Sequence, residues 1–206
     1  TELPEKEEAS VYVPRPEFEL PGGEYSYYIS IEITSDVKGQ IYYTLDGSEP
    51  TKDSMRYEEP ILIKDASENE NVYSMRTDVC GSFLKEDTLY KTPGYLVDKC
   101  TIIKAVYYDQ SGVKSDAEER TYFVNYEEKN GYEDINIISI TTEPGNLFSD
   151  EQGIYVLGNT FEEFAANNNL EDYNDYRWKA NYLNRGKDWE RKAYIQVFDE
   201  EKNPNL

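Results

Sequence analysis

The sequence predicts a mostly β protein whose first 125 residues form a β-sandwich. Aromatic residues, which favour strands, are abundant: the 206 residues include 20 tyrosines, seven phenylalanines and two tryptophans. Leucine and alanine, which favour helices, are sparse. Segments of alternating apolar and polar residues recur at regular spacing, separated by turn-forming residues, and about seven such strands are typical of a sandwich.

The predicted strands follow one another along the chain between short turns. Residues 27–34 alternate between isoleucine or tyrosine and polar side chains, as a half-buried antiparallel strand does. Residues 41–45 and 60–63 form the next short strands. Residues 101–108 are partly apolar on both faces, which predicts a central strand, and residues 121–124 close the set.

A tight polar turn follows the strand at 41–45 and consists of Asp46, Gly47, Ser48 and Pro50. Aspartate accepts hydrogen bonds from nearby backbone, and glycine tolerates positive φ without steric cost. Proline removes a donor that would extend the strand pairing. No nucleophile stands beside a base here, so we interpret the motif as a structural turn, with a ligand-facing loop as the alternative.

The charge and composition exclude several classes of function. A formal net charge of −21 makes phosphate backbones and anionic lipids poor partners, so we expect no nucleic-acid binding. The absence of histidine excludes a Ser-His-Asp triad and histidine-ligated metal sites. No apolar run approaches 18 residues, so we expect no membrane insertion.

The chain divides into three predicted regions: a frayed lead-in at 1–13, the sandwich at 14–125 and a second part at 126–206. Asn130-Gly131 is a turn signal in the polar connector at the boundary. Within the sandwich, residues 65–98 form a long polar insert whose role the sequence does not define.

The second part is predicted to be β-rich with one short helix. Residues 135–140 are a candidate buried strand, and residues 153–158 are a second strand between glycines. Thr160, three residues before Glu163, matches a capping box at the start of a helix. Residues 190–199 alternate as a last strand.

The motifs of the first part resemble a known family. They comprise Pro21-Gly22-Gly23, the core Tyr-Thr-x-Asp-Gly-Ser-x-Pro-Thr within residues 41–51, Pro60-Ile61 and Ile103-Lys104-Ala105. Over residues 14–125 this pattern resembles the chitobiase/β-hexosaminidase C-terminal domain, a fibronectin-III-like (Ig-like) sandwich. The resemblance implies an accessory module without catalytic residues, attached to secreted and often carbohydrate-active proteins.

The second part resembles the opening segment of CotH-type kinase proteins. The matching motifs lie in residues 140–148, 153–158 and 185–199. The resemblance implies a secreted bacterial parent, of the kind known from spore coats, with a kinase-like domain after Leu206 as partner. The chain begins at Thr1 and not Met, so we expect a mature or excised piece. It carries no phosphate-binding glycine loop or Walker lysine, so we expect no ATP chemistry in it.

Two groups of residues are candidates for covalent or interface roles. Cys80 and Cys100, the only cysteines, either form a disulfide or remain two separate buried thiols. The densest polar-aromatic group is Arg185, Trp189, Glu190 and Arg191. It is either a contact for a partner or an internal arginine–carboxylate pair beside a packed tryptophan, and the internal arrangement is favoured.

Two further groups are candidates for ligand binding. The acidic residues Glu171, Asp172 and Asp175 offer oxygen ligands for calcium, although they lack the pattern of an EF-hand loop. Several tyrosines offer a flat platform for sugars, although alternate residues of a strand point into the core. These tyrosines are Tyr25, Tyr27, Tyr28, Tyr42, Tyr107 and Tyr108.

Together these observations predict a non-catalytic extracellular module that positions a downstream domain of a CotH-kinase-type protein. The alternative is a carbohydrate-binding accessory module for cell-wall or plant polysaccharide. We assign no catalytic residue, and no cofactor other than the calcium considered above.

Overall fold

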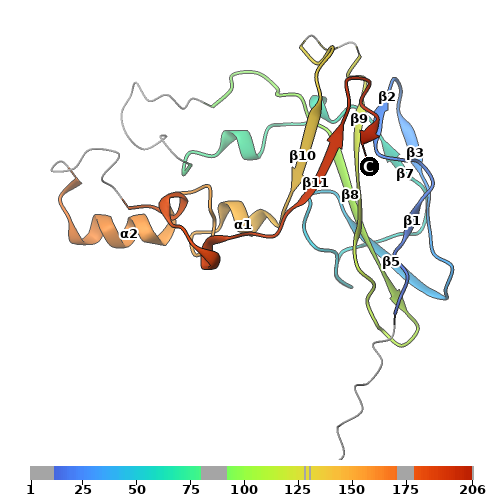
Figure 1. Cartoon of the computed structure of the whole chain (residues 1–206), viewed down its shortest axis with the longest axis horizontal. Coiled ribbons are helices and arrows are strands. Elements are labelled where there is room, and N and C mark those ends of the chain that lie inside the picture. Colours follow the sequence, from blue (N-terminus) through green and yellow to red (C-terminus); the bar gives the residue numbers. More distant parts are fainter. Residues whose placement is uncertain (1–11, 80–91, 128, 130, 171–178, 206) are drawn as a thin grey trace, which may run out of the picture.

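The computed structural model describes residues 12–79, 92–127, 129, 131–170 and 179–205. It shows a mostly β protein with several small sheets and few short helices, as the sequence predicts (Figure 1). Among the described residues, no helix has the length and hydrophobicity needed to cross a membrane.

The largest element is a five-stranded sheet in the order β2-β9-β8-β5-β6. The predicted central strand, β8, does lie in the middle of this sheet. β2 pairs with β9 in parallel, and the other neighbours are antiparallel. The strands are β2 (Gly23–Tyr25), β5 (Gly39–Thr44), β6 (Met55–Arg56), β8 (Thr101–Asp109) and β9 (Glu118–Val124).

Two short ribbons cover one face of this sheet. β1 (Glu17–Phe18) pairs with β4 (Ile33–Thr34), and β3 (Ile29–Ile31) pairs with β7 (Ile61–Ile63). The strand predicted over 27–34 is therefore divided between two ribbons. The alternation of its isoleucines continues through the division, because Ile31 and Ile33 are both buried.

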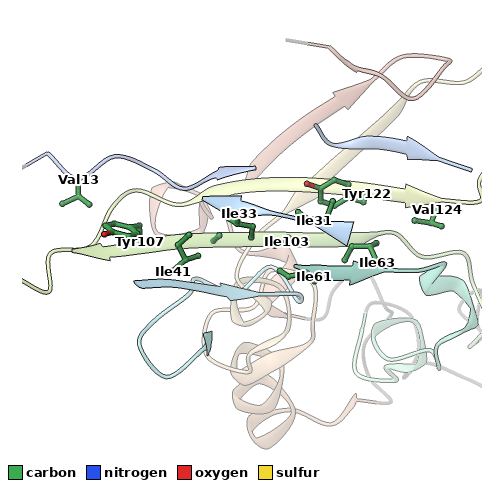
Figure 2. Close-up of a cluster of buried hydrophobic side chains, with 11 residues drawn as sticks. Val13, Ile31, Ile33, Ile41, Ile61, Ile63, Ile103, Tyr107, Tyr122 and Val124 are labelled. Carbon is green, nitrogen blue, oxygen red and sulfur yellow. The ribbon is translucent and has the colours of Figure 1, made fainter. Parts of the chain in front are cut away.

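The core of the sandwich lies between the ribbons and the five-stranded sheet (Figure 2). Burying these aliphatic and aromatic side chains is the main stabilising contribution to the sandwich. Val13, the last residue of the predicted frayed lead-in, belongs to this core. The cluster consists of Val13, Ile31, Ile33, Ile41, Ile61, Ile63, Ile103, Ala105, Tyr107, Tyr122 and Val124.

A third layer lies against the opposite face of β8 and β9. It is an antiparallel sheet in the order β10-β11-β12, and Figure 1 shows β10 and β11 running together across β8 and β9. Its strands are β10 (Ile137–Thr141), β11 (Tyr194–Phe198) and β12 (Pro204–Asn205). The prediction of a buried strand over 135–140 is wrong about burial: none of these residues is buried, and Ile138 and Ile140 are 61% and 65% exposed.

The helices lie to one side of the sandwich (Figure 1). They are α1 (Pro144–Phe148) and α2 (Gly158–Asn167), and α2 packs on its own small cluster around Phe161 and Phe164. Short 3₁₀ turns are η1 (Ala66–Glu68), η2 (Tyr73–Met75), η5 (Asn181–Leu183) and η6 (Lys187–Trp189).

Two local predictions in this region are wrong. Residues 153–158 form no strand; Val156 makes only an isolated bridge with Val79. Thr160 is not the N-cap, because α2 begins at Gly158 and the Thr160 backbone N–H donates to Asn181 Oδ1 at 3.2 Å. A distant side chain thus satisfies a donor of the first helical turn, which no local motif reveals.

Candidate functional site

The inner face of the third layer is polar where it meets β9. Thr121, fully buried, has its hydroxyl 2.9 Å from that of Ser139. Gln196 Nε2 donates to Thr121 Oγ1 at 3.2 Å, and Gln196 Oε1 accepts from the Thr121 backbone N–H at 3.3 Å. Buried polar groups are costly unless paired, so these bonds fix how the two sheets align.

An aromatic cluster completes the same contact at the far end of β11. Phe198 has no exposed surface and packs edge-to-face on Phe123, with ring centroids 5.0 Å apart. Tyr126 packs on Phe123 at 5.2 Å. Burial of this kind joins the third layer to the sandwich through the hydrophobic effect as well as through hydrogen bonds.

A buried lysine links the Asp46–Pro50 turn, β8 and β11. The Lys104 side chain is only 3% exposed; its Nζ lies 2.9 Å from Glu49 Oε2 and 4.4 Å from the centre of the Tyr194 ring. The other oxygen of Glu49 pairs with Lys114 at 2.7 Å. Partial burial by itself raises the pKa of Glu49, but the two lysine hydrogen bonds outweigh it and the pKa is lowered.

One buried carboxyl in this contact is poorly satisfied. Glu119 is 6% exposed; Oε1 lies 3.4 Å from Gln196 Nε2, while Oε2 has no hydrogen-bond partner among the described residues. Burial raises the pKa of Glu119, because the charged form loses hydration. The enclosed position between two layers gives this carboxyl little access to a substrate.

The outer face of the third layer is apolar and uncovered. Cross-strand partners Ile140 and Ile195 are 65% and 64% exposed, and the adjacent partners Ile138 and Val197 are 61% and 36% exposed. We call these four residues the aliphatic face. Antiparallel sheets usually turn their polar side chains to solvent, so this arrangement is reversed. Contiguous exposed apolar side chains mark interaction surfaces.

The predicted turn lies against the third layer. Asp46 Oδ1 accepts hydrogen bonds from the backbone N–H and hydroxyl of Ser48, at 3.0 and 2.6 Å. Gly47 has φ of +80°, and a Cβ there would lie 2.6 Å from Thr141 Cγ2 on β10. Pro50 is fully buried. The turn therefore contacts protein on both sides, which favours a structural over a ligand-binding role.

The predicted polar-aromatic group is only partly brought together. Arg191 donates to the carbonyl of Gln152 through Nε and Nη2, at 3.0 and 2.6 Å, and its guanidinium lies 5.3 Å from the Trp189 ring centre. This is an internal contact, although it uses a main-chain carbonyl where the sequence predicts a carboxylate. Glu190 is exposed and contributes only its backbone carbonyl, which accepts from Arg191 Nη1 at 2.9 Å. Arg185 is exposed and takes no part in this contact.

Two predicted sites fall outside the described residues. The first is the Cys80–Cys100 disulfide, which stays a prediction because Cys80 lies outside the described residues. Cys100 itself is half-buried beside the Phe123 cluster. Glu171, Asp172 and Asp175, the proposed calcium ligands, also lie outside. Within the described part of the chain, no three Cys, Asp or Glu residues gather closely enough to hold a metal ion.

The six candidate tyrosines separate into two groups. Tyr107 is buried, and Tyr25, Tyr42 and Tyr108 are partly buried. Tyr27 and Tyr28 are 80% and 70% exposed. Both lie on the bend between β2 and β3, beyond the end of the strand, so the rule that neighbouring residues point to opposite faces no longer applies.

Sequence reasoning missed the role of the 65–98 insert. Its Tyr73 ring stacks on Phe148 of α1 at 4.8 Å, and the Arg76 guanidinium lies 4.9 Å from the same ring. The Leu157 backbone N–H donates to the Asp78 carbonyl at 3.1 Å. The insert thus joins the two predicted parts, and only the aromatic and arginine residues in an otherwise polar stretch hinted at this.

Comparison with known proteins supports part of the sequence interpretation. Residues 31–122 match the family model described as Fn3 associated, which covers less than half of the chain. No curated protein and no solved structure gives a significant match. The first part is therefore similar to Fn3-associated domains, and its fold is a fibronectin-III-like sandwich. The chitobiase and CotH assignments stay predictions.

Proposed function

We propose that the chain is a non-catalytic structural module of a secreted bacterial protein, and that it positions a following kinase-like domain. The Fn3-associated match favours a module without catalysis. The downstream domain and the extracellular location rest on the resemblance of residues 140–199 to the start of CotH-type kinase proteins.

The observation that carries the proposal is the reversed sheet β10–β11. The polar side chains of this sheet contact the sandwich; Gln196, for example, donates a hydrogen bond to Thr121 of β9. The aliphatic face on its other side is exposed to solvent. A sheet attached rigidly on one side and apolar on the other is suited to hold the next layer of protein. The neighbouring domain would then be held at a fixed angle to the sandwich.

Hydroxyl-radical footprinting tests this proposal, because it measures the solvent accessibility of individual side chains. The 206-residue chain is compared with a longer polypeptide that includes the kinase-like domain of the parent. We expect oxidation of Ile140 and Ile195 to fall several-fold in the longer polypeptide. Leu62 on β7, which is 53% exposed on a different layer, serves as the internal control and should not change. Equal oxidation of the aliphatic face in both polypeptides would refute the proposal.

A further inference from the structure

The exposed pair Tyr27 and Tyr28 borders a hollow at one end of the sandwich. The hollow has a volume of about 540 Å³ and is lined by these rings together with polar side chains. Those side chains come from the bend itself, from the segment after β7 and from the segment after β9. They are Ser26, Lys64, Asp65, Glu68, Asn125 and Glu127.

The two rings have no structural task that accounts for their exposure. In the described part of the chain, neither Tyr27 nor Tyr28 makes a ring contact, a cation–π contact or a hydrogen bond. Two adjacent tyrosines at 80% and 70% exposure therefore offer flat apolar area and two hydroxyl groups to a ligand. Tyrosine gives such contact area at a low cost in conformational entropy, since its ring has few rotatable bonds.

The bend is held in place by bonds to the strand beside it. The Asn125 backbone N–H donates to the Tyr25 carbonyl at 2.9 Å, and the Ser26 hydroxyl donates to Glu127 at 3.2 Å. Asn125 itself has φ of +63°. These contacts hold the backbone just before the rings, and just after them β3 begins at Ile29 and pairs with β7. Part of the entropy cost of binding is therefore already met in the free protein.

The polar lining has hydrogen-bonding capacity to spare. Lys64 and Glu68 have no ion-pair partner among the described residues. Asp65 is committed to Lys129 at 2.8 Å and to the Ser67 backbone N–H. The hollow therefore combines free donors and acceptors with apolar ring surface. Its three carboxylates against one lysine, in a chain of net charge −21, disfavour an anionic ligand.

We propose that the Tyr27–Tyr28 hollow binds a neutral oligosaccharide. The C–H face of a pyranose ring is apolar and flat, and it stacks on a tyrosine ring, while its edge carries hydroxyl groups that bond carboxylates and amines. Aromatic side chains that join an apolar body to a polar tip suit such a ligand. None of the residues that line the hollow belongs to the aliphatic face, and the site does not depend on the function proposed above.

Isothermal titration calorimetry with the full 206-residue chain tests the site. The probes are cellohexaose, xylohexaose and N-acetylchitohexaose as neutral sugars, with oligogalacturonate as the anionic comparison. We expect at least one neutral hexaose to bind, and the double variant Tyr27→Ala/Tyr28→Ala to lose roughly tenfold or more in affinity. Tyr95→Ala removes a ring that is 73% exposed elsewhere and should leave binding unchanged.

Three outcomes would overturn the proposal. The first is no binding of any neutral hexaose at millimolar concentration, and the second is stronger binding of the anionic sugar. The third is binding that survives the double variant or falls equally in Tyr95→Ala. Circular dichroism of both variants confirms that they are folded, which we expect because the replaced rings are exposed.

Discussion

The attachment of the third layer to the sandwich can be tested at Phe198. This ring has no exposed surface and packs on Phe123 at 5.0 Å, between β11 and β9. Replacing a fully buried phenylalanine by alanine removes its burial energy and leaves a cavity, which together cost roughly 3–5 kcal/mol. Because β-sheet backbone on both sides limits collapse of that cavity, we expect a loss of about 4 kcal/mol for Phe198→Ala.

A matched control lies on the same strand. Ile195 points away from the sandwich and is 64% exposed, and threonine keeps the β-branched shape that strands favour. We expect Ile195→Thr to change the free energy of unfolding by no more than about 0.5 kcal/mol. The contrast between the two variants measures which face of β11 is inside.

Urea unfolding, followed in parallel by circular dichroism and intrinsic fluorescence, provides the measurement. If the layers form one cooperative unit, Phe198→Ala lowers the midpoint of a single transition seen by both probes. The reasoning fails if Phe198→Ala costs less than about 1 kcal/mol, or if Ile195→Thr costs as much as Phe198→Ala. It also fails if the sandwich unfolds in a separate transition that Phe198→Ala leaves unchanged.

Three further predictions concern the turn and the buried charges. Gly47→Ala forces a side chain into positive φ and against Thr141, so it should lower the free energy of unfolding by about 1–3 kcal/mol in a denaturant titration; no loss would contradict the geometry. The pKa of Glu49 in the folded protein lies below its ordinary value near 4.5. The stabilisation of the fold by the Glu49 carboxylate is therefore complete above pH 4.5 and is lost as pH falls through the folded pKa. Glu49→Gln should therefore lower the free energy of unfolding at neutral pH by about 1 kcal/mol, a small value because Glu49 is 39% exposed. It should also flatten the acid side of the Tm–pH profile, and an unchanged profile would argue against the pair with Lys104. The pKa of Glu119 is raised, so the stability of the folded protein falls as pH rises through the folded pKa of this group. Glu119→Gln should therefore raise Tm at neutral pH, whereas a lower Tm would show that the carboxylate is stabilising.

The parts of the fold that could be predicted from sequence are those whose signals are local. β8 is partly apolar on both faces, and it is the central strand of its sheet. The isoleucines of β3 and β4 alternate, and they form the core. The Asp46–Gly47 turn carries its own hydrogen-bonding and conformational requirements, so the turn could be predicted from local sequence, although its contact with Thr141 could not.

The orientation of β10 and β11 could not be predicted in this way. Alternation divides each strand into two faces, but it does not say which face is inside when the partner surface is unknown. Here the outer surface of β8 and β9 carries Lys104, Glu119 and Thr121, and it pairs with Ser139 and Gln196. The general expectation that the aliphatic face of a sheet is buried is therefore wrong for β10 and β11, whose polar face is inside.

The exposed tyrosines escaped prediction for a different reason. A Tyr-Tyr doublet in a strand places one ring on each face, so one of the two is expected in the core. β2 ends at Tyr25 and the chain bends before β3 begins at Ile29, which leaves Tyr27 and Tyr28 both in solvent. The length of a strand depends on its partner, which local sequence does not specify.

The strong negative charge explains how the aliphatic face can remain uncovered. An apolar sheet face invites self-association, but two copies of this chain each carry a net charge of −21 and repel one another. The domain proposed above, joined to the same polypeptide, would meet the face at an effective concentration in the millimolar range, where a small apolar contact is sufficient. Charge would then select against a second copy, and tethering would select for the proposed neighbouring domain. On this proposal the same four aliphatic side chains would serve as an intramolecular contact, while charge repulsion opposes self-association of the free module.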